Sequence, residues 1–148
     1  MKTTFSYPKW AEIPNIDLYL DQVLLYVNQI CDPLSPDKDK GLTASMVNNY
    51  VKHGYLTKPD KKKYQRQQIA RLIAITTLKS VFSIQEIAQT LNTLQSQASS
   101  DQLYDAFVDY MNQGIDPANP IIQTSCQTVK LYHQTLALIH HTKEEVIQ

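Results

Sequence analysis

The sequence of 148 residues contains few glycines, few cysteines and no long apolar run. Gly41, Gly54 and Gly114 stand too far apart to form a glycine-rich phosphate-binding loop. Cys31 and Cys126 lack the close spacing of metal ligands, so we expect two structural thiols in a reducing compartment. No apolar run approaches the roughly 20 residues that a membrane span needs, and the first residues lack a signal-peptide core. We therefore expect a cytoplasmic protein without a membrane segment.

Residues that could carry catalysis or bind a metal form no convincing group. We find no Ser/His/Asp or Cys/His set and no carboxylate pair whose spacing indicates catalysis. Cys126, His133 and His140 recur at a heptad spacing, which is too long for one metal on a straight helix that rises about 1.5 Å per residue. A metal shared between two chains is the alternative, but surface histidines and a buried thiol fit the pattern better. We therefore expect no enzymatic activity and no cofactor.

The net charge is zero, but the charges are unevenly distributed along the chain. Residues 38–79 contain ten basic and two acidic residues, for a net charge of +8. Both flanks are acidic, because residues 1–37 carry −3 and residues 80–148 carry −5. A basic middle segment attracts polyanions while the molecule as a whole stays neutral.

Hydrophobic periodicity predicts a mainly α-helical protein. The expected helices span residues 17–30, 43–53, 66–81, 84–94, 101–112 and 120–145, with a loop at 32–42. Ser83 and Glu86 have the spacing of a capping box, and Asn119 followed by Pro120 is a typical helix start. We place a domain boundary near residue 95, with a helical region at 96–148. The acidic side chains of Asp105 and Asp109 are expected on a solvated helix face.

The expected helix at 43–53 has two contrasting faces. Its apolar face carries Met46, Val47, Tyr50 and Val51, and the opposite face carries Ser45, Asn48, Asn49 and Lys52. An α-helix fits the major groove of DNA, where an asparagine can hydrogen-bond the edge of an adenine. The four polar residues are therefore candidates for base contact, with ordinary helix surface as an equally supported alternative.

Residues 55–64 predict a two-stranded wing, with two short extended pieces around a turn at Pro59 and Asp60. Lysines in a wing can neutralise phosphates and release counterions. A lysine run is in general more often a solvated turn, but its position directly after the amide-rich helix favours phosphate contact here. The candidates for phosphate contact are Thr43, Lys58, Lys61, Lys62, Lys63, Tyr64 and Arg66. For Tyr64, packing that fixes the wing is the stronger expectation.

These motifs, in this order, resemble the winged helix-turn-helix DNA-binding domain of the MerR family of bacterial regulators. The matching segments are Tyr50-Val51-Lys52-His53-Gly54-Tyr55-Leu56, Pro59, Lys62-Lys63-Tyr64, Ile69-Ala70-Arg71-Leu72-Ile73 and Phe82-Ser83-Ile84-Gln85-Glu86-Ile87. The resemblance covers about one third of the chain and implies a regulator that binds double-stranded DNA. The chain departs from that family at Asn48 and Lys62, where MerR regulators usually have arginine, and in its longer loop at 32–42.

The chain also resembles an uncharacterised family of small Firmicute proteins, a domain of unknown function. The features that match are Pro8-Lys9-Trp10, the segment Asp17–Gln22 and the segment Asn48–Lys52. This resemblance reaches to about Leu91 and implies no activity.

The last expected helix offers a surface for a second chain. Ile122, Val129 and Leu136 recur every seven residues, with Tyr132 and Ile139 between them. This seam suits a homodimer through the C-terminal helices, and packing onto the same chain is an equal alternative. Two other functions stay open: an adaptor that keeps the fold without binding DNA, and a sensor whose C-terminal helices bind a small-molecule effector.

Overall fold

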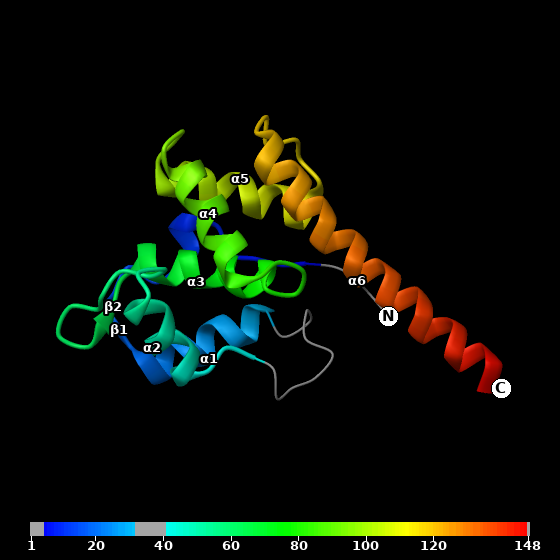
Figure 1. Ribbon diagram of the computed structural model, residues 1–148, viewed down its shortest axis with the longest axis horizontal. Coiled ribbons are helices and arrows are strands. Elements are labelled where there is room, and N and C mark those ends of the chain that lie inside the picture. Colours follow the sequence, from blue (N-terminus) through cyan, green and yellow to red (C-terminus); the bar gives the residue numbers. More distant parts are fainter. Residues whose placement is uncertain (1–4, 32–40, 148) are drawn as a thin grey trace.

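The computed structural model describes residues 5–31 and 41–147 (Figure 1). In those ranges the chain forms η1 (Trp10–Glu12), β1 (Leu18–Tyr19), α1 (Leu20–Cys31), α2 (Ala44–Lys52), β2 (Lys63–Tyr64), α3 (Arg66–Leu78), α4 (Ile84–Gln95), α5 (Ser100–Gln113) and α6 (Pro120–Ile147). The expected mainly α-helical fold is confirmed. Most of the expected loop at 32–42, including Lys38 and Lys40, lies outside the described residues.

Helix α3 lies at the centre of the molecule and packs against α1, α4, α5 and α6 (Figure 1). It is buried on most of its circumference, as expected for a helix surrounded by others. Its buried residues are Gln68, Ile69, Ala70, Leu72, Ile73, Ile75, Thr77 and Leu78. The core cluster runs from Phe5 to Val129, so side chains from both sides of the expected boundary near residue 95 belong to one core.

The helix ends follow local capping. The expected capping box of α4 is confirmed, since Glu86 N donates to Ser83 Oγ at 3.2 Å and Ser83 N donates to Glu86 Oε1 at 2.9 Å. Asn119 Oδ1 accepts from Ile121 N at 2.9 Å and so caps α6. The helix predicted at 66–81 was too long, because α3 ends at Leu78 and the chain turns before α4.

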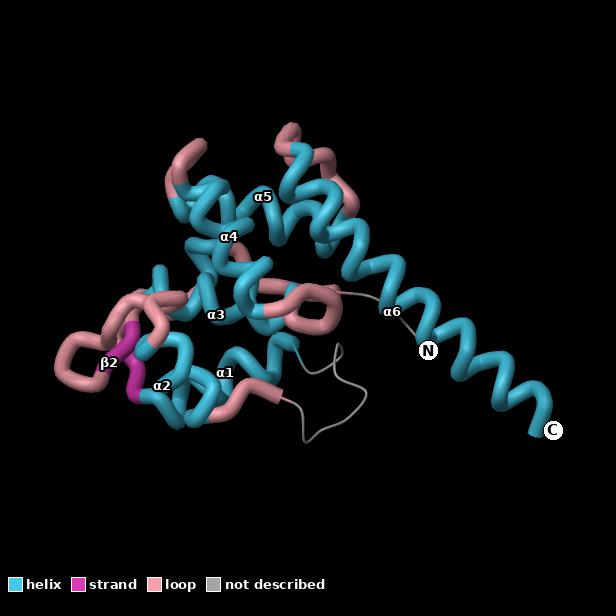
Figure 2. Tube along the Cα trace, in the orientation of Figure 1, coloured by secondary structure: helices cyan, strands magenta, loops and turns pink. Residues whose placement is uncertain are grey.

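The small sheet consists of β1 and β2, which pair antiparallel with Leu18 opposite Tyr64 and Tyr19 opposite Lys63 (Figure 2). The expected first helix was therefore placed too early, because Leu18 and Tyr19 form a strand. Asp17, the first residue of the expected helix, precedes the strand, and α1 begins where Gln22 Oε1 accepts a hydrogen bond from Tyr19 N at 2.9 Å. The sheet thus joins the segment before α1 to the segment before α3.

The N-terminal arm is fastened to α5 by backbone hydrogen bonds. Asn112 Oδ1 accepts from Tyr7 N at 2.8 Å, and Asn112 Nδ2 donates to Tyr7 O at 3.0 Å. Trp10 N donates to Asp105 Oδ1 at 2.8 Å, and Lys9 forms an ion pair with Asp109 at 3.3 Å. The expectation that Asp105 and Asp109 form only a solvated surface is therefore wrong, because both hold the arm.

The seam expected on α6 divides into two parts. Ile122 and Val129 are buried against the same chain, at 4% and 0% exposure. Beyond them α6 projects away from the body (Figure 1), and Tyr132 and Ile139 are exposed. The first part of the seam therefore serves intramolecular packing, which was the alternative interpretation of the pattern.

The described ranges contain no helix long and apolar enough to cross a membrane. Within them, no three or more metal-ligating side chains gather in one place. Cys31 and Cys126 are both buried thiols. His133 is not the surface residue expected from the sequence: it is 9% exposed, its ring lies edge-on to those of Phe5 and Tyr132, and burial lowers its pKa.

Candidate nucleic-acid interface

The candidate base-reading face of α2 is exposed. Ser45, Asn48, Asn49 and Lys52 all point to solvent, while Val47 and Tyr50 on the opposite face are 0% and 3% exposed. The apolar face anchors α2 on the core, and the amide-rich face is exposed to solvent. Thr43 caps the helix, since its Oγ1 accepts from Met46 N at 3.2 Å.

A side chain that sequence reasoning missed holds the start of α2. Asn28, on α1, donates from Nδ2 to Leu42 O at 2.9 Å and accepts at Oδ1 from Leu42 N at 2.8 Å. Leu42 directly precedes the cap residue Thr43, so this two-bond clamp positions α2 relative to α1. The preceding Gly41 fits closely, because a Cβ there would lie 2.7 Å from Asn28 Oδ1.

The chain after α2 differs from the expected wing. Residues 55–58 do not form the first strand of a hairpin; they are held by side chains of α3. Arg71 Nε donates to Tyr55 O at 2.7 Å, and Gln68 Nε2 donates to Thr57 O and Lys58 O at 3.0 and 3.1 Å. The expected pairing within residues 55–64 is therefore wrong. Strand β2 pairs with β1, and side chains of α3 bind the carbonyls of Tyr55, Thr57 and Lys58.

The tip of this region is a tight two-residue turn. Asp60 and Lys63 exchange backbone hydrogen bonds of 3.1 and 2.9 Å, which places the turn at Lys61 and Lys62 and not at Pro59 and Asp60 as expected. Lys61 and Lys62 have φ values of 50° and 66°. Such turns favour Asn-Gly, and the left-handed conformation costs other residues roughly 1–2 kcal/mol each. Two exposed lysines occupy a conformation that disfavours their side chains.

The remaining candidates for phosphate contact differ in exposure. Lys58 is exposed, like the two lysines of the turn, whereas Lys63 is half-buried, with Nζ 5.3 Å from the centroid of the Tyr19 ring. Tyr64 is 3% exposed, and burial raises its pKa, so its ring belongs to the core. Arg66 is half-buried, and its Nε donates to Ile13 O at 3.1 Å.

Ion pairing does not neutralise the basic side chains of α2 and the turn. Among the residues that the structure describes, the ion pair that forms joins Lys9 to Asp109 at 3.3 Å. Lys52, Lys61 and Lys62 take no part in an ion pair within those ranges. In Figure 1 the turn projects beyond α2 at the end of the molecule opposite the end of α6. Exposed amides and unneutralised cations therefore lie on neighbouring elements.

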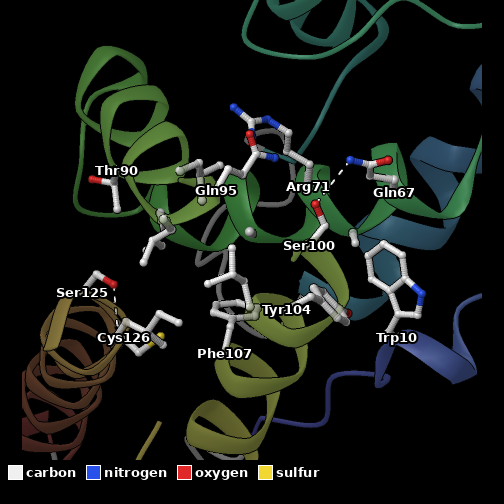
Figure 3. Close-up of a pocket in the computed structure, with 17 residues that line it drawn as sticks. Trp10, Gln67, Arg71, Thr90, Gln95, Ser100, Tyr104, Phe107, Ser125 and Cys126 are labelled. Atoms are coloured by element: carbon white, nitrogen blue, oxygen red, sulfur yellow. Dashed lines mark hydrogen bonds between the residues drawn. The ribbon is translucent and has the colours of Figure 1, made fainter. Parts of the chain in front are cut away.

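A cavity lies on the other side of α3, between that helix and α4, α5 and α6 (Figure 3). Its volume is about 90 Å³. The small side chains Ala70 and Ala74 of α3 leave this space open.

Comparison with known proteins identifies the family but no activity. A family model described as a domain of unknown function, DUF1836, matches residues 8–107. The match runs from the N-terminal arm into α5, past the expected boundary near residue 95, and leaves α6 outside. No curated protein and no solved structure matches the chain. Because the model covers more than half of the sequence, the chain belongs to the DUF1836 family, as the resemblance over its first 91 residues indicated.

Proposed function

We propose that this protein is a transcriptional regulator that binds double-stranded DNA. The observation that carries the proposal is the pair Lys61 and Lys62, held at the tip of a strained turn next to the exposed amide face of α2. Unfavourable backbone conformations persist in proteins mainly where they serve a function, and here they present two cations to a partner. The resemblance of residues 50–87 to the MerR DNA-binding domain supports the same function.

In this proposal α2 enters the major groove and the turn contacts the backbone of the duplex. Ser45, Asn48, Asn49 and Lys52 read base edges, since amides and a lysine can each match the groove's donors and acceptors. Thr43, Lys58, Lys61 and Lys62 contact phosphates, which gives affinity without sequence preference. Lys63, Tyr64 and Arg66 support the turn and the start of α3 from their more buried positions.

Base reading by α2 can be tested with Asn48→Ala, after a preferred duplex has been selected from a random pool. The loss of one bidentate base contact costs about 1–3 kcal/mol, so affinity for the preferred duplex should fall roughly 5- to 150-fold. Affinity for random DNA and the salt dependence should stay unchanged, because no phosphate contact is removed. Gln102→Ala, an exposed amide on α5, is the matched control. Equal weakening on random and preferred DNA would contradict base reading.

We also propose that the projecting part of α6 pairs with a second copy of the chain. Leu131, Tyr132, Leu138 and Ile139 form an apolar stripe and are 53%, 41%, 60% and 48% exposed. Thr135 lies between the two apolar pairs and Thr142 follows them on the same face. Their hydroxyls donate to Leu131 O and Leu138 O at 2.8 and 2.9 Å. Because these hydroxyls already donate hydrogen bonds to backbone carbonyls, burying the stripe in an interface leaves no hydroxyl donor unpaired and costs little free energy.

Three observations favour a second copy of the chain as the packing partner of this stripe. Helix α6 continues for 14 residues beyond the buried His133. An isolated helix of about that length is marginal in water, so this part of α6 needs a packing partner. The stripe repeats at the heptad spacing of paired helices, with Leu131 to Leu138 and Tyr132 to Ile139. A dimer would also present two α2 helices to two half-sites of one duplex, as dimeric helix-turn-helix proteins do.

Dimerisation predicts a large effect of Leu131→Glu combined with Leu138→Glu. Each substitution would bury an unpaired carboxylate in the paired stripe, so the dimer dissociation constant should rise about 100-fold or more. Sedimentation equilibrium measures the change directly. Gln134→Glu adds a charge to α6 at an exposed position outside the stripe and should leave the dimer intact. A wild-type protein that is monomeric at high micromolar concentration would refute the proposal.

A further inference from the structure

The cavity behind α3 is bounded by four helices and by the N-terminal arm. In Figure 3, side chains of α3 and α4 lie above it, side chains of α5 and α6 lie below it, and Trp10 closes one side. Ala70 and Ala74, one turn apart on α3, line this space of about 90 Å³ together with larger apolar residues such as Leu91 and Phe107. The cavity is therefore built at a junction of helices and is not a surface groove along one of them.

Three polar side chains around this cavity donate hydrogen bonds within the protein. Thr90 Oγ1 donates to Glu86 O at 2.8 Å, Ser125 Oγ donates to Ile122 O at 3.2 Å, and Gln67 Nε2 donates to Ser100 Oγ at 3.3 Å. Because these donors have partners, the walls offer a ligand mainly apolar contact.

Two further polar residues of the lining also favour an uncharged, apolar occupant. Burial raises the pKa of the Cys126 thiol to about 12, so this sulfur lies in the wall as a neutral group. Arg71 uses its guanidinium on Tyr55 O, at 2.7 Å, and on Asn92 Oδ1, at 3.3 Å. Its charge is therefore directed to protein oxygens, and an anion in the cavity would lack a dedicated partner.

We infer that this cavity is a binding site for a small, uncharged, apolar molecule of about the size of a benzene ring. An enclosed apolar cavity of about 150 Å³ stays dry and takes up benzene or xenon. The cavity here is smaller but opens to solvent, so a ring can enter and a substituent can extend outward. This site does not depend on DNA binding, because its walls are formed by residues outside the α2 face and the turn.

Benzene is a direct probe of the site in the full-length protein. Methyl-resolved NMR spectra should show ring-current shifts, on addition of benzene, at Leu91, Leu94 and Ile122, which line the cavity. The methyl groups of Val23 and Val47, which lie in the core away from it, should not move. Benzene should also raise the melting temperature by a few degrees, because it binds the folded state alone.

Ala74→Leu should abolish both responses, because the larger side chain occupies the cavity. Ala137→Leu makes the same change on α6, away from the lining, and should leave both responses intact. Should Ala74→Leu fail to fold, the wild-type methyl spectra still decide. Shifts confined to the lining residues would support the site, whereas no shift up to the solubility limit of benzene, or equal shifts throughout the core, would overturn it.

Discussion

Lys61→Asn combined with Lys62→Gly should make the protein more stable and weaken its binding to DNA. Both residues have positive φ, at 50° and 66°, in a two-residue turn closed by Asp60 and Lys63. The pair Asn-Gly suits this turn, so relief of the backbone strain should raise the free energy of unfolding by about 1–2 kcal/mol. The same change removes two exposed positive charges and therefore the proposed phosphate contacts.

The two effects can be measured separately on this double variant. Urea unfolding at equilibrium gives the stability change, and the midpoint should move upward with an unchanged m-value. Lys61→Ala with Lys62→Ala is the matched control, because it removes the charges without supplying residues that favour positive φ. This control should lose DNA affinity without becoming more stable. A lower unfolding midpoint for Lys61→Asn with Lys62→Gly would show that the two lysines are not strained.

Asn28→Ala should destabilise the protein and displace α2. The substitution leaves Leu42 N and Leu42 O without the partners that now lie at 2.8 and 2.9 Å. Each polar group left unpaired in a partly buried position costs about 1–3 kcal/mol, so we expect a loss of roughly 2–4 kcal/mol in the free energy of unfolding. Affinity for DNA should also fall, because the start of α2 is no longer fixed to α1.

Two further variants separate the hydrogen bonds of this clamp from packing around it. Asn28→Asp keeps an acceptor for Leu42 N and loses the donor to Leu42 O, so its stability should lie between that of the wild type and that of Asn28→Ala. Gly41→Ala should push against the clamp from outside, because the added Cβ would lie 2.7 Å from Asn28 Oδ1. Thermal unfolding of the three variants gives the order of their stabilities. If Asn28→Ala unfolds at the wild-type temperature, the clamp contributes nothing measurable.

The helices could be predicted from the sequence because their signals are local. Apolar residues recur at helical spacing, and the Ser83–Glu86 box and the Asn119 cap mark two of the starts. The exposed face of α2 followed from the same periodicity, since Val47 and Tyr50 fix which side is buried. Family membership was also recognisable, because the motifs at residues 8–10, 17–22 and 48–52 lie within the matched segment.

The turn region could not be predicted because long-range contacts decide it. Strands of two residues, such as Leu18–Tyr19 and Lys63–Tyr64, are too short to show an alternating pattern. Turn propensities favoured Pro59 and Asp60, whereas Gln68 holds Thr57 O and Lys58 O and moves the reversal to Lys61 and Lys62. Nothing in the sequence marks Asn28 as the partner of Leu42, which lies 14 residues away.

The measurement that tests DNA binding most directly is a salt titration with a mixed pool of duplex DNA. The wild type should bind, with an observed association constant that falls steeply as salt rises, because bound lysines release counterions. The double variant of Lys61→Asn with Lys62→Gly should lose affinity, and its log–log salt slope should be shallower by about 2, one unit for each phosphate contact removed. If the wild type shows no binding at low salt, DNA binding is contradicted, and the basic surface is to be tested against acidic protein partners.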